Sequence, residues 1–134
     1  TRRSSDLHMA VTYTNAVKVA RMAAVVTQAG TTAVLEIGTA SMASVLATIA
    51  LGNPIAGAAT GAGVLTLSGF PRSDTSADAT GTAAAARIRT ASGGTDIITG
   101  LTVGLSGADV ILDSLSITAG QTVTINSAVF THAA

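Results

Sequence analysis

The last third of the chain repeats one pattern, in which short segments of alternating side chains each end at a glycine turn. Between residues 82 and 90 the even positions are small or apolar and include Ile88, whereas Arg87 and Arg89 occupy odd positions. Because side chains on a β-strand point alternately to its two faces, this alternation predicts a half-buried strand. The glycine pair at 93–94 then predicts a turn.

The same rule predicts further strands up to the end of the chain. Apolar residues alternate over Ile97–Val103, Val110–Leu112, Leu115–Ile117 and Val123–Val129, with glycine-containing turns between the segments. Such spacing is typical of an all-β domain. The last two segments flank the short turn Thr118–Gln121, so we expect them to pair as a β-hairpin.

One α-helix is predicted over residues 14–29. Thr14 or Asn15 can cap its N-terminus, and Gly30 stands where a helix commonly ends. Apolar residues recur at helical spacing and form a stripe of Val19, Met22, Ala23 and Val26. This stripe is expected either to pack across a sheet or to dock on a neighbouring subunit.

The middle of the chain carries no charged residue between Glu36 and Arg72. We interpret it as three strands, Val34–Ile37, Val45–Leu51 and Val64–Ser68, with one helical turn after the first. A membrane helix needs about 20 apolar residues, but Asn53-Pro54 and four glycines between 52 and 63 favour a loop between strands. We therefore expect no membrane span.

The polar stretch from Phe70 to Asp78 is predicted to be an exposed connection. Asp74 and Asp78 lack the dense acidic pattern of a calcium loop. Asp109 and Asp113 are expected to face solvent from one side of a strand.

Composition sets the fold class that these segments build. The chain has 134 residues and no cysteine, which predicts one domain that depends on packing alone. Residues 1–8 are expected to be a cloning remnant, because His8-Met9 matches a common cloning junction. Residues 9–134 are then predicted to form a mainly β domain, an antiparallel β-sandwich or jelly-roll-like fold with one N-terminal α-helix.

Residue types argue against catalysis and against nucleic-acid binding. Of the two histidines, His8 falls in the predicted remnant and His132 is the third residue from the end, so we do not expect a Ser-His-Asp arrangement. The glycine run Gly57–Gly63 lacks the Lys-Ser/Thr ending of a phosphate loop. Base-stacking surfaces need aromatic and basic residues, and aromatics make up 2% of the chain. We predict a protein that is not an enzyme and has no catalytic, cofactor-binding or metal-binding residue.

Low charge predicts association with other protein. Charged residues make up 10% of the chain, against about 25% in typical soluble domains. The formal net charge is zero, and a net charge near zero favours association.

Several stretches resemble small virion proteins of tailed bacteriophages and prophages. The resemblance covers almost all of the chain after Met9 and is carried by Tyr13–Met22, Leu35–Ala47, Ala79–Ile88, Leu101–Gly104, Ile117–Ile125 and Thr131–Ala134. It implies a structural component of the virion, and within that class a capsid decoration or cement protein. Such a protein is expected on the capsid surface, and in the host cytoplasm before assembly.

The resemblance also implies partners, namely the major capsid protein and further copies of the chain, as a homotrimer. Exposed sheet edges at Val34–Ile37 and Val123–Thr131 are expected to pair with these partners. The predicted interface residues are Val19, Met22, Val26, Val34, Ile37, Val123, Ile125 and Val129. A tail or fibre component remains an alternative, as does a small glycan- or ligand-binding module that would use Tyr13, Phe70 and Phe130.

Overall fold

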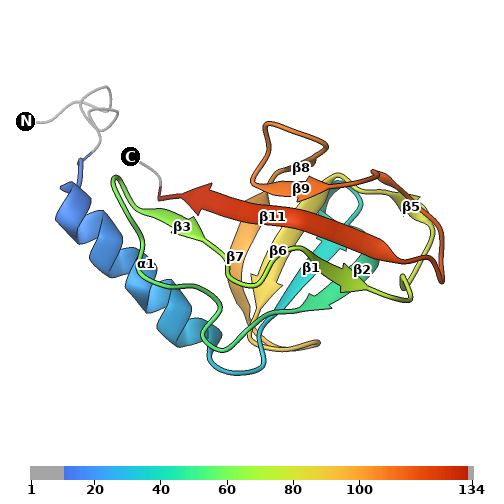
Figure 1. The fold of residues 1–134 in the computed structure, drawn as a ribbon, viewed down its shortest axis with the longest axis horizontal. Helices are drawn as coiled ribbons and strands as arrows, with labels where there is room; N and C mark the ends of the chain where they lie inside the picture. Colours follow the sequence, from blue (N-terminus) through green and yellow to red (C-terminus); the bar gives the residue numbers. More distant parts are fainter. Residues whose placement is uncertain (1–10, 133–134) are drawn as a thin grey trace, which may run out of the picture.

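A computed structural model describes the chain from Val11 to His132, and within this range the fold is mainly β with one α-helix (Figure 1). This confirms the predicted fold class, and the arrangement is β-sandwich-like. The predicted cloning remnant, residues 1–8, lies outside the described residues.

Helix α1 (Asn15–Ala29) forms where the sequence predicts it. The Thr14 hydroxyl accepts a hydrogen bond from the Val17 backbone N–H at 3.3 Å and so caps one of the free N–H groups of the first turn. Gly30 ends the helix with a positive φ of 68°. The helix buries Met22 and Ala29 and lies across one end of the strands, in contact with β3 and β7 (Figure 1).

The first sheet has four antiparallel strands in the order β2 (Val45–Ala50), β1 (Val34–Gly38), β6 (Ala85–Arg89) and β7 (Asp96–Leu101). The predicted helical turn between the first two is a short 3-10 helix, η2 (Ala40–Met42). Strand β1 lies between β2 and β6, and all five of its residues are buried. Its near-continuous apolar sequence is typical of an interior strand that is covered on both faces.

The second sheet is built around β11 (Val123–Thr131). On one side it pairs with β9 (Val110–Leu112), which is followed outward by β8 (Val103–Gly104). On its other side it pairs first with β4 (Arg72–Asp74) and then with β3 (Val64–Thr66). The long arrow of β11 crosses over the strands of the first sheet in Figure 1.

The inner faces of the two sheets share one hydrophobic core. Side chains that are fully buried come from both sheets and include Leu35, Ile37, Ile49, Ile88, Leu65, Val110, Leu112 and Ile125. Alternation along β11 places Val123 and Ile125 inward and Thr124 and Asn126 outward. The core therefore forms from the period-two pattern that the sequence displays.

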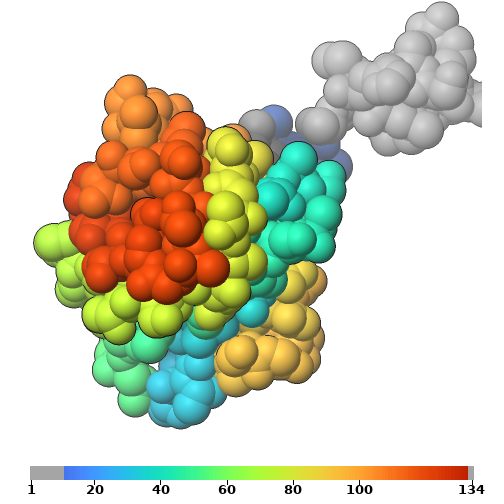
Figure 2. Space-filling model, turned by 90° about the vertical axis from the view of Figure 1, so that its right-hand side faces the viewer, coloured from blue at the N-terminus to red at the C-terminus, as the bar shows by residue number. Residues whose placement is uncertain are grey.

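The predicted hairpin between Leu115–Ile117 and Val123–Val129 is wrong. The turn itself forms, with a hydrogen bond from the Gln121 N–H to the Thr118 carbonyl at 3.0 Å. However, β10 (Ser116–Ile117) pairs with β5 (Gly81–Thr82) and not with β11. The turn also bonds to residues 77–80 through Gly120 and Ala119, so the two turn segments lie side by side at the end of the molecule opposite α1 (Figure 2).

The predicted sheet edges are also wrong, because β1 and β11 each pair with strands on both sides. Strand addition needs free backbone groups along an edge. Strand β1 is paired along its whole length on both sides, and each side of β11 is paired over part of its length. The stretch Phe70–Asp78, expected to be an exposed connection, contains β4 and so contributes to the second sheet.

The predicted loop between β2 and β3 ends at Gly63, where the backbone lies close to Lys18 of α1 and to His132 after β11. The φ of Gly63 is +84°, and a Cβ there would lie 2.8 Å from the Cβ of His132 and 3.0 Å from that of Lys18. Glycine thus lets α1, β3 and the end of β11 meet. Among the described residues, no helix is long and apolar enough to cross a membrane.

Replacing Ile125 with alanine is expected to lower the free energy of unfolding by about 3 kcal/mol, because it opens a cavity where both sheets meet. Urea titration followed by circular dichroism measures the change. The matched control is Val11→Ala at an exposed position, with an expected change of about 0.5 kcal/mol or less. If the Ile125→Ala and Val11→Ala variants have the same free energy of unfolding, the prediction that β11 contributes to the core is wrong.

Candidate functional site

The eight predicted interface residues lie mostly inside the chain. Met22, Val34, Ile37, Val123 and Ile125 are buried, while Val19, Val26 and Val129 are half-buried. Sequence patterns find apolar faces, but here those faces pack against one another. The five buried side chains are therefore used in the core, and the three half-buried ones keep part of their surface in solvent.

Three of the four large apolar side chains that reach solvent in the described region lie near the start of α1. Among the described residues the exposed ones are Val11 (75%), Tyr13 (40%), Val17 (42%) and Leu105 (58%). We call Val11, Tyr13 and Val17 the N-terminal patch. The predicted interface does not include this patch, because Val17 lies outside the apolar stripe that was predicted for the helix. The sequence feature that indicates the patch is the spacing of Tyr13 and Val17, which are four residues apart and so can lie on the same side of the chain.

Tyr13 is held in place although it is exposed. The Arg21 guanidinium carbon lies 4.5 Å from the centre of the tyrosine ring, a cation–π contact. The His132 ring meets the same ring edge-on, with centroids 6.0 Å apart and planes at 83°. Contacts of this kind contribute about 0.5–1 kcal/mol at exposed sites. They fix the aromatic side chain, so a partner loses less entropy when it binds there.

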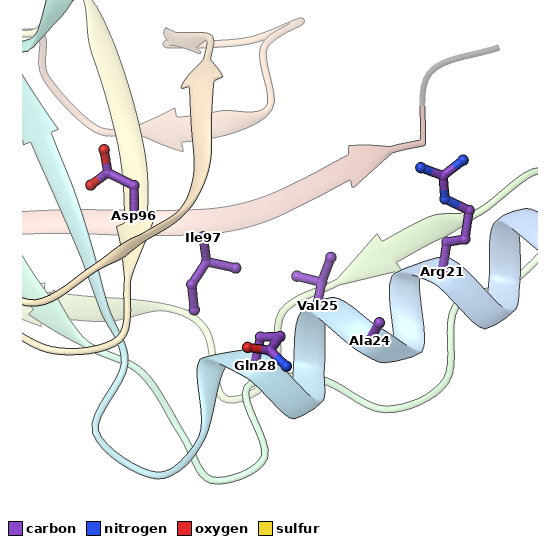
Figure 3. A pocket seen from close by; sticks show the side chains of 6 residues that line it. All are labelled: Arg21, Ala24, Val25, Gln28, Asp96 and Ile97. Carbon is purple, nitrogen blue, oxygen red and sulfur yellow. The ribbon is translucent and has the colours of Figure 1, made fainter.

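A groove runs between α1 and β7 beside this patch. One hollow of about 260 Å³ is lined by Arg21, Ala24, Val25, Gln28, Asp96 and Ile97 (Figure 3). A second, of about 450 Å³, shares Val25 and is lined mainly by apolar residues, with Asp109 and Thr99 among the polar ones. We call the two together the α1–β7 groove. Figure 3 shows Ile97 of β7 and Val25 of α1 directed into the space between the two elements.

Strand β7 is an edge strand with an interrupted backbone. Within the described sheet it pairs with β6 alone, and its register with β6 shifts twice. Gly100 adds a positive φ of 74°. Bulges bend an edge and spoil it as a template for another strand. The groove is therefore better suited to receive side chains than to add a strand.

A charged cluster occupies the face of the first sheet that points away from the core. Glu36 is buried, and its Oε1 lies 2.6 Å from Arg87 Nε and 3.8 Å from Arg89 Nη1. Arg89 Nε in turn lies 3.0 Å from Asp96 Oδ1. Two acids and two bases neutralise one another, so the cluster ties β1, β6 and β7 together. The signal in the sequence was a single acid inside an apolar strand, which needs a partner when buried.

Other carboxylates brace turns. Asp74 accepts hydrogen bonds from the N–H groups of Thr48 and Ser76, both at 3.0 Å. Asp109 Oδ2 accepts from the N–H and hydroxyl of Thr102, at 2.9 and 3.1 Å. Residues 11–132 contain no group of three or more His, Cys, Asp or Glu side chains placed to hold a metal ion.

The three aromatic residues considered for glycan binding do not present open rings together. Phe130 is buried in the core. The guanidinium of Arg72 lies over the Phe70 ring, 5.7 Å from its centre, and Arg21 lies over Tyr13. Stacking a sugar would need these faces to be free.

Comparison of the chain with protein-family models, with curated proteins and with solved structures found no match.

Glu36→Ala is expected to lower the free energy of unfolding by about 2–3 kcal/mol. Removing one partner of a buried pair costs about 3–5 kcal/mol, and we place the value below that range because both arginines retain some contact with water. Chemical denaturation measures it. Asp113→Ala, at an exposed position, is the control, with an expected change within about 0.5 kcal/mol. Equal stability of the two variants would show that the cluster does not hold the sheet.

Proposed function

We propose that the chain is a non-enzymatic structural protein of a tailed-phage virion that binds the head surface as a decoration or cement protein. The observation that carries this proposal is the N-terminal patch, an exposed apolar surface with a braced aromatic residue. Exposed apolar clusters on soluble proteins often mark sites where another protein binds. The family resemblance is the reason for proposing a virion as the assembly. The N-terminal patch is the surface through which the chain would bind to it.

Low charge also suits this role. A cement protein meets many equivalent positions on a shell, so modest contacts are multiplied by multivalency. Seven basic and seven acidic residues balance in the whole sequence, and within the described region Glu36, Arg87, Arg89 and Asp96 pair with one another. Contacts to the shell would then rest on apolar and backbone groups more than on ion pairs.

The proposed partners are the major capsid protein and further copies of the chain, with a homotrimer as the expected assembly. The proposed location is the capsid surface of the virion, after a period in the host cytoplasm. A tail or fibre component is the close alternative, because it shares the same composition. The two differ in the surface bound, heads in one case and tail tubes in the other.

Binding to heads tests the proposal directly. Empty heads made from the major capsid protein of the encoding phage are mixed with the purified chain and sedimented. We expect saturation at a fixed ratio to the capsid protein, and little loss of binding when salt rises from about 0.1 to 1 M, because screening acts mainly on charged contacts.

Purified tails from the same phage serve as the comparison. Sedimentation with tails but not with heads would favour the alternative. Failure to sediment with either would count against a virion role.

A further inference from the structure

We propose that residues 72–78 cap the outward edge of β2 and so prevent a second copy of this chain from adding a strand there. We call these residues, which include β4, the β4 segment. The proposal goes beyond the proposed function and does not rest on it, because the edge of β2 needs protection whatever the chain binds.

Strand β2 has the sequence of an edge that another strand could join. It ends the first sheet, and among the described strands only β1 pairs with it. Residues 45–51 are all apolar except Thr48 and include no charged residue, proline or glycine. Segments of about six or seven residues with this composition pair readily with copies of themselves. The register shift between β1 and β2 lies at the start of β2, opposite Gly38, so the remainder of the strand is regular.

The backbone groups of β2 divide between its two sides. The Leu51 N–H, just beyond the strand, donates to the Ala33 carbonyl at 3.0 Å on the β1 side. Since alternate residues of an antiparallel strand bond to the same neighbour, the odd-numbered residues of β2 face β1. The N–H and C=O groups of Leu46, Thr48 and Ala50 therefore point outward.

The β4 segment binds one backbone group of each of these three outward residues. The Asp78 N–H donates to the Leu46 carbonyl at 2.7 Å, the Thr48 N–H donates to Asp74 Oδ2 at 3.0 Å, and Arg72 Nη1 donates to the Ala50 carbonyl at 3.4 Å. A strand that approached β2 would have to displace these groups before it could pair.

The β4 segment can do this because it belongs to the other sheet. The backbone of β4 pairs with β11, and side chains two residues apart on a strand point to the same side, so Arg72 and Asp74 both reach β2. Asp74 is also oriented by the Ser76 N–H, which donates to its Oδ1 at 3.0 Å. The Thr48 hydroxyl donates to Asp78 Oδ2 at 3.0 Å.

The charges in the β4 segment replace those that β2 lacks. Edge strands commonly carry a charged residue that opposes pairing with a further strand. The chain has no charged residue between Glu36 and Arg72, so β2 has none of its own. Arg72 and Asp74, which lie 22 and 26 residues beyond the β2 groups they bind, bring charge to this edge through the fold.

Hydrogen exchange of single amides, followed by NMR, tests the cap in the unmodified chain. The Thr48 amide is expected to exchange at least about tenfold more slowly than in an unstructured peptide, although it points away from its sheet. Asp74→Ala is expected to remove most of this protection, while the Leu51 amide, which bonds to Ala33, keeps its exchange rate. A Thr48 amide that exchanges at the peptide rate in the unmodified chain would overturn the proposal.

The association of variants tests the consequence. Asp74→Ala is expected to form sedimenting multimers at least about tenfold faster than the unmodified chain, because the β2 edge is open. The matched control is Asp109→Ala, which removes a carboxylate that accepts from the Thr102 N–H before β9, and it is expected to associate no faster than the unmodified chain. Circular dichroism establishes that both variants are folded. Equal rates for the two variants would contradict the proposal, and if Asp74→Ala does not fold, the exchange of the Thr48 amide in the unmodified chain decides.

A charge placed on β2 itself shows which edge the multimers use. Ala50 is exposed at the end of β2. Adding Ala50→Lys to Asp74→Ala is expected to return association to the rate of the unmodified chain, because a lysine on an edge strand opposes further pairing. Leu105→Lys adds the same charge at another exposed position and is expected to leave association fast. If the two lysines act equally, the multimers do not form through β2 and the proposal is wrong.

Discussion

Pairing of β11 on both of its sides is the constraint on which the rest of the structure depends. This strand hydrogen-bonds to β9 along one side and to β4 and β3 along the other, and it buries Val123, Ile125, Ala128 and Phe130. The chain has no cysteine, so no disulfide links these strands. Segments more than 60 residues apart in sequence are therefore joined by one strand and the core beneath it.

Burial of these apolar side chains in the core determines which apolar residues remain exposed at the surface. The apolar run of β1 and the inward-facing apolar residues of β11 are buried in the core of the sandwich, and the buried side of α1 packs at one end between β3 and β7. Among the described residues, the large apolar side chains that stay exposed are Val11, Tyr13 and Val17 near the start of α1, and Leu105; a hollow also lies between the helix and the edge strand. The exposed patch is thus a consequence of how the end of the sandwich is closed.

Local patterns predicted the elements, whereas pairing partners required the structure. The helix and most strands follow from periods of 3.6 and 2, and Thr14 and Gly30 mark the helix ends, because these signals act within a few residues. The hairpin before Val123 failed since Ile117 bonds to Gly81, 36 residues away. Glu36 escaped notice as a structural residue for the same reason: its partner Arg87 is 51 residues distant.

The form of the β7 edge bears on the kind of assembly that this fold permits. An exposed, regular edge in a sparsely charged chain would invite open-ended sheet growth, which is the route to fibres. The two register shifts and Gly100 remove that regularity at β7, whereas β2 forms the other edge of the first sheet. Addition of a further strand along β7 is therefore unfavourable in this fold.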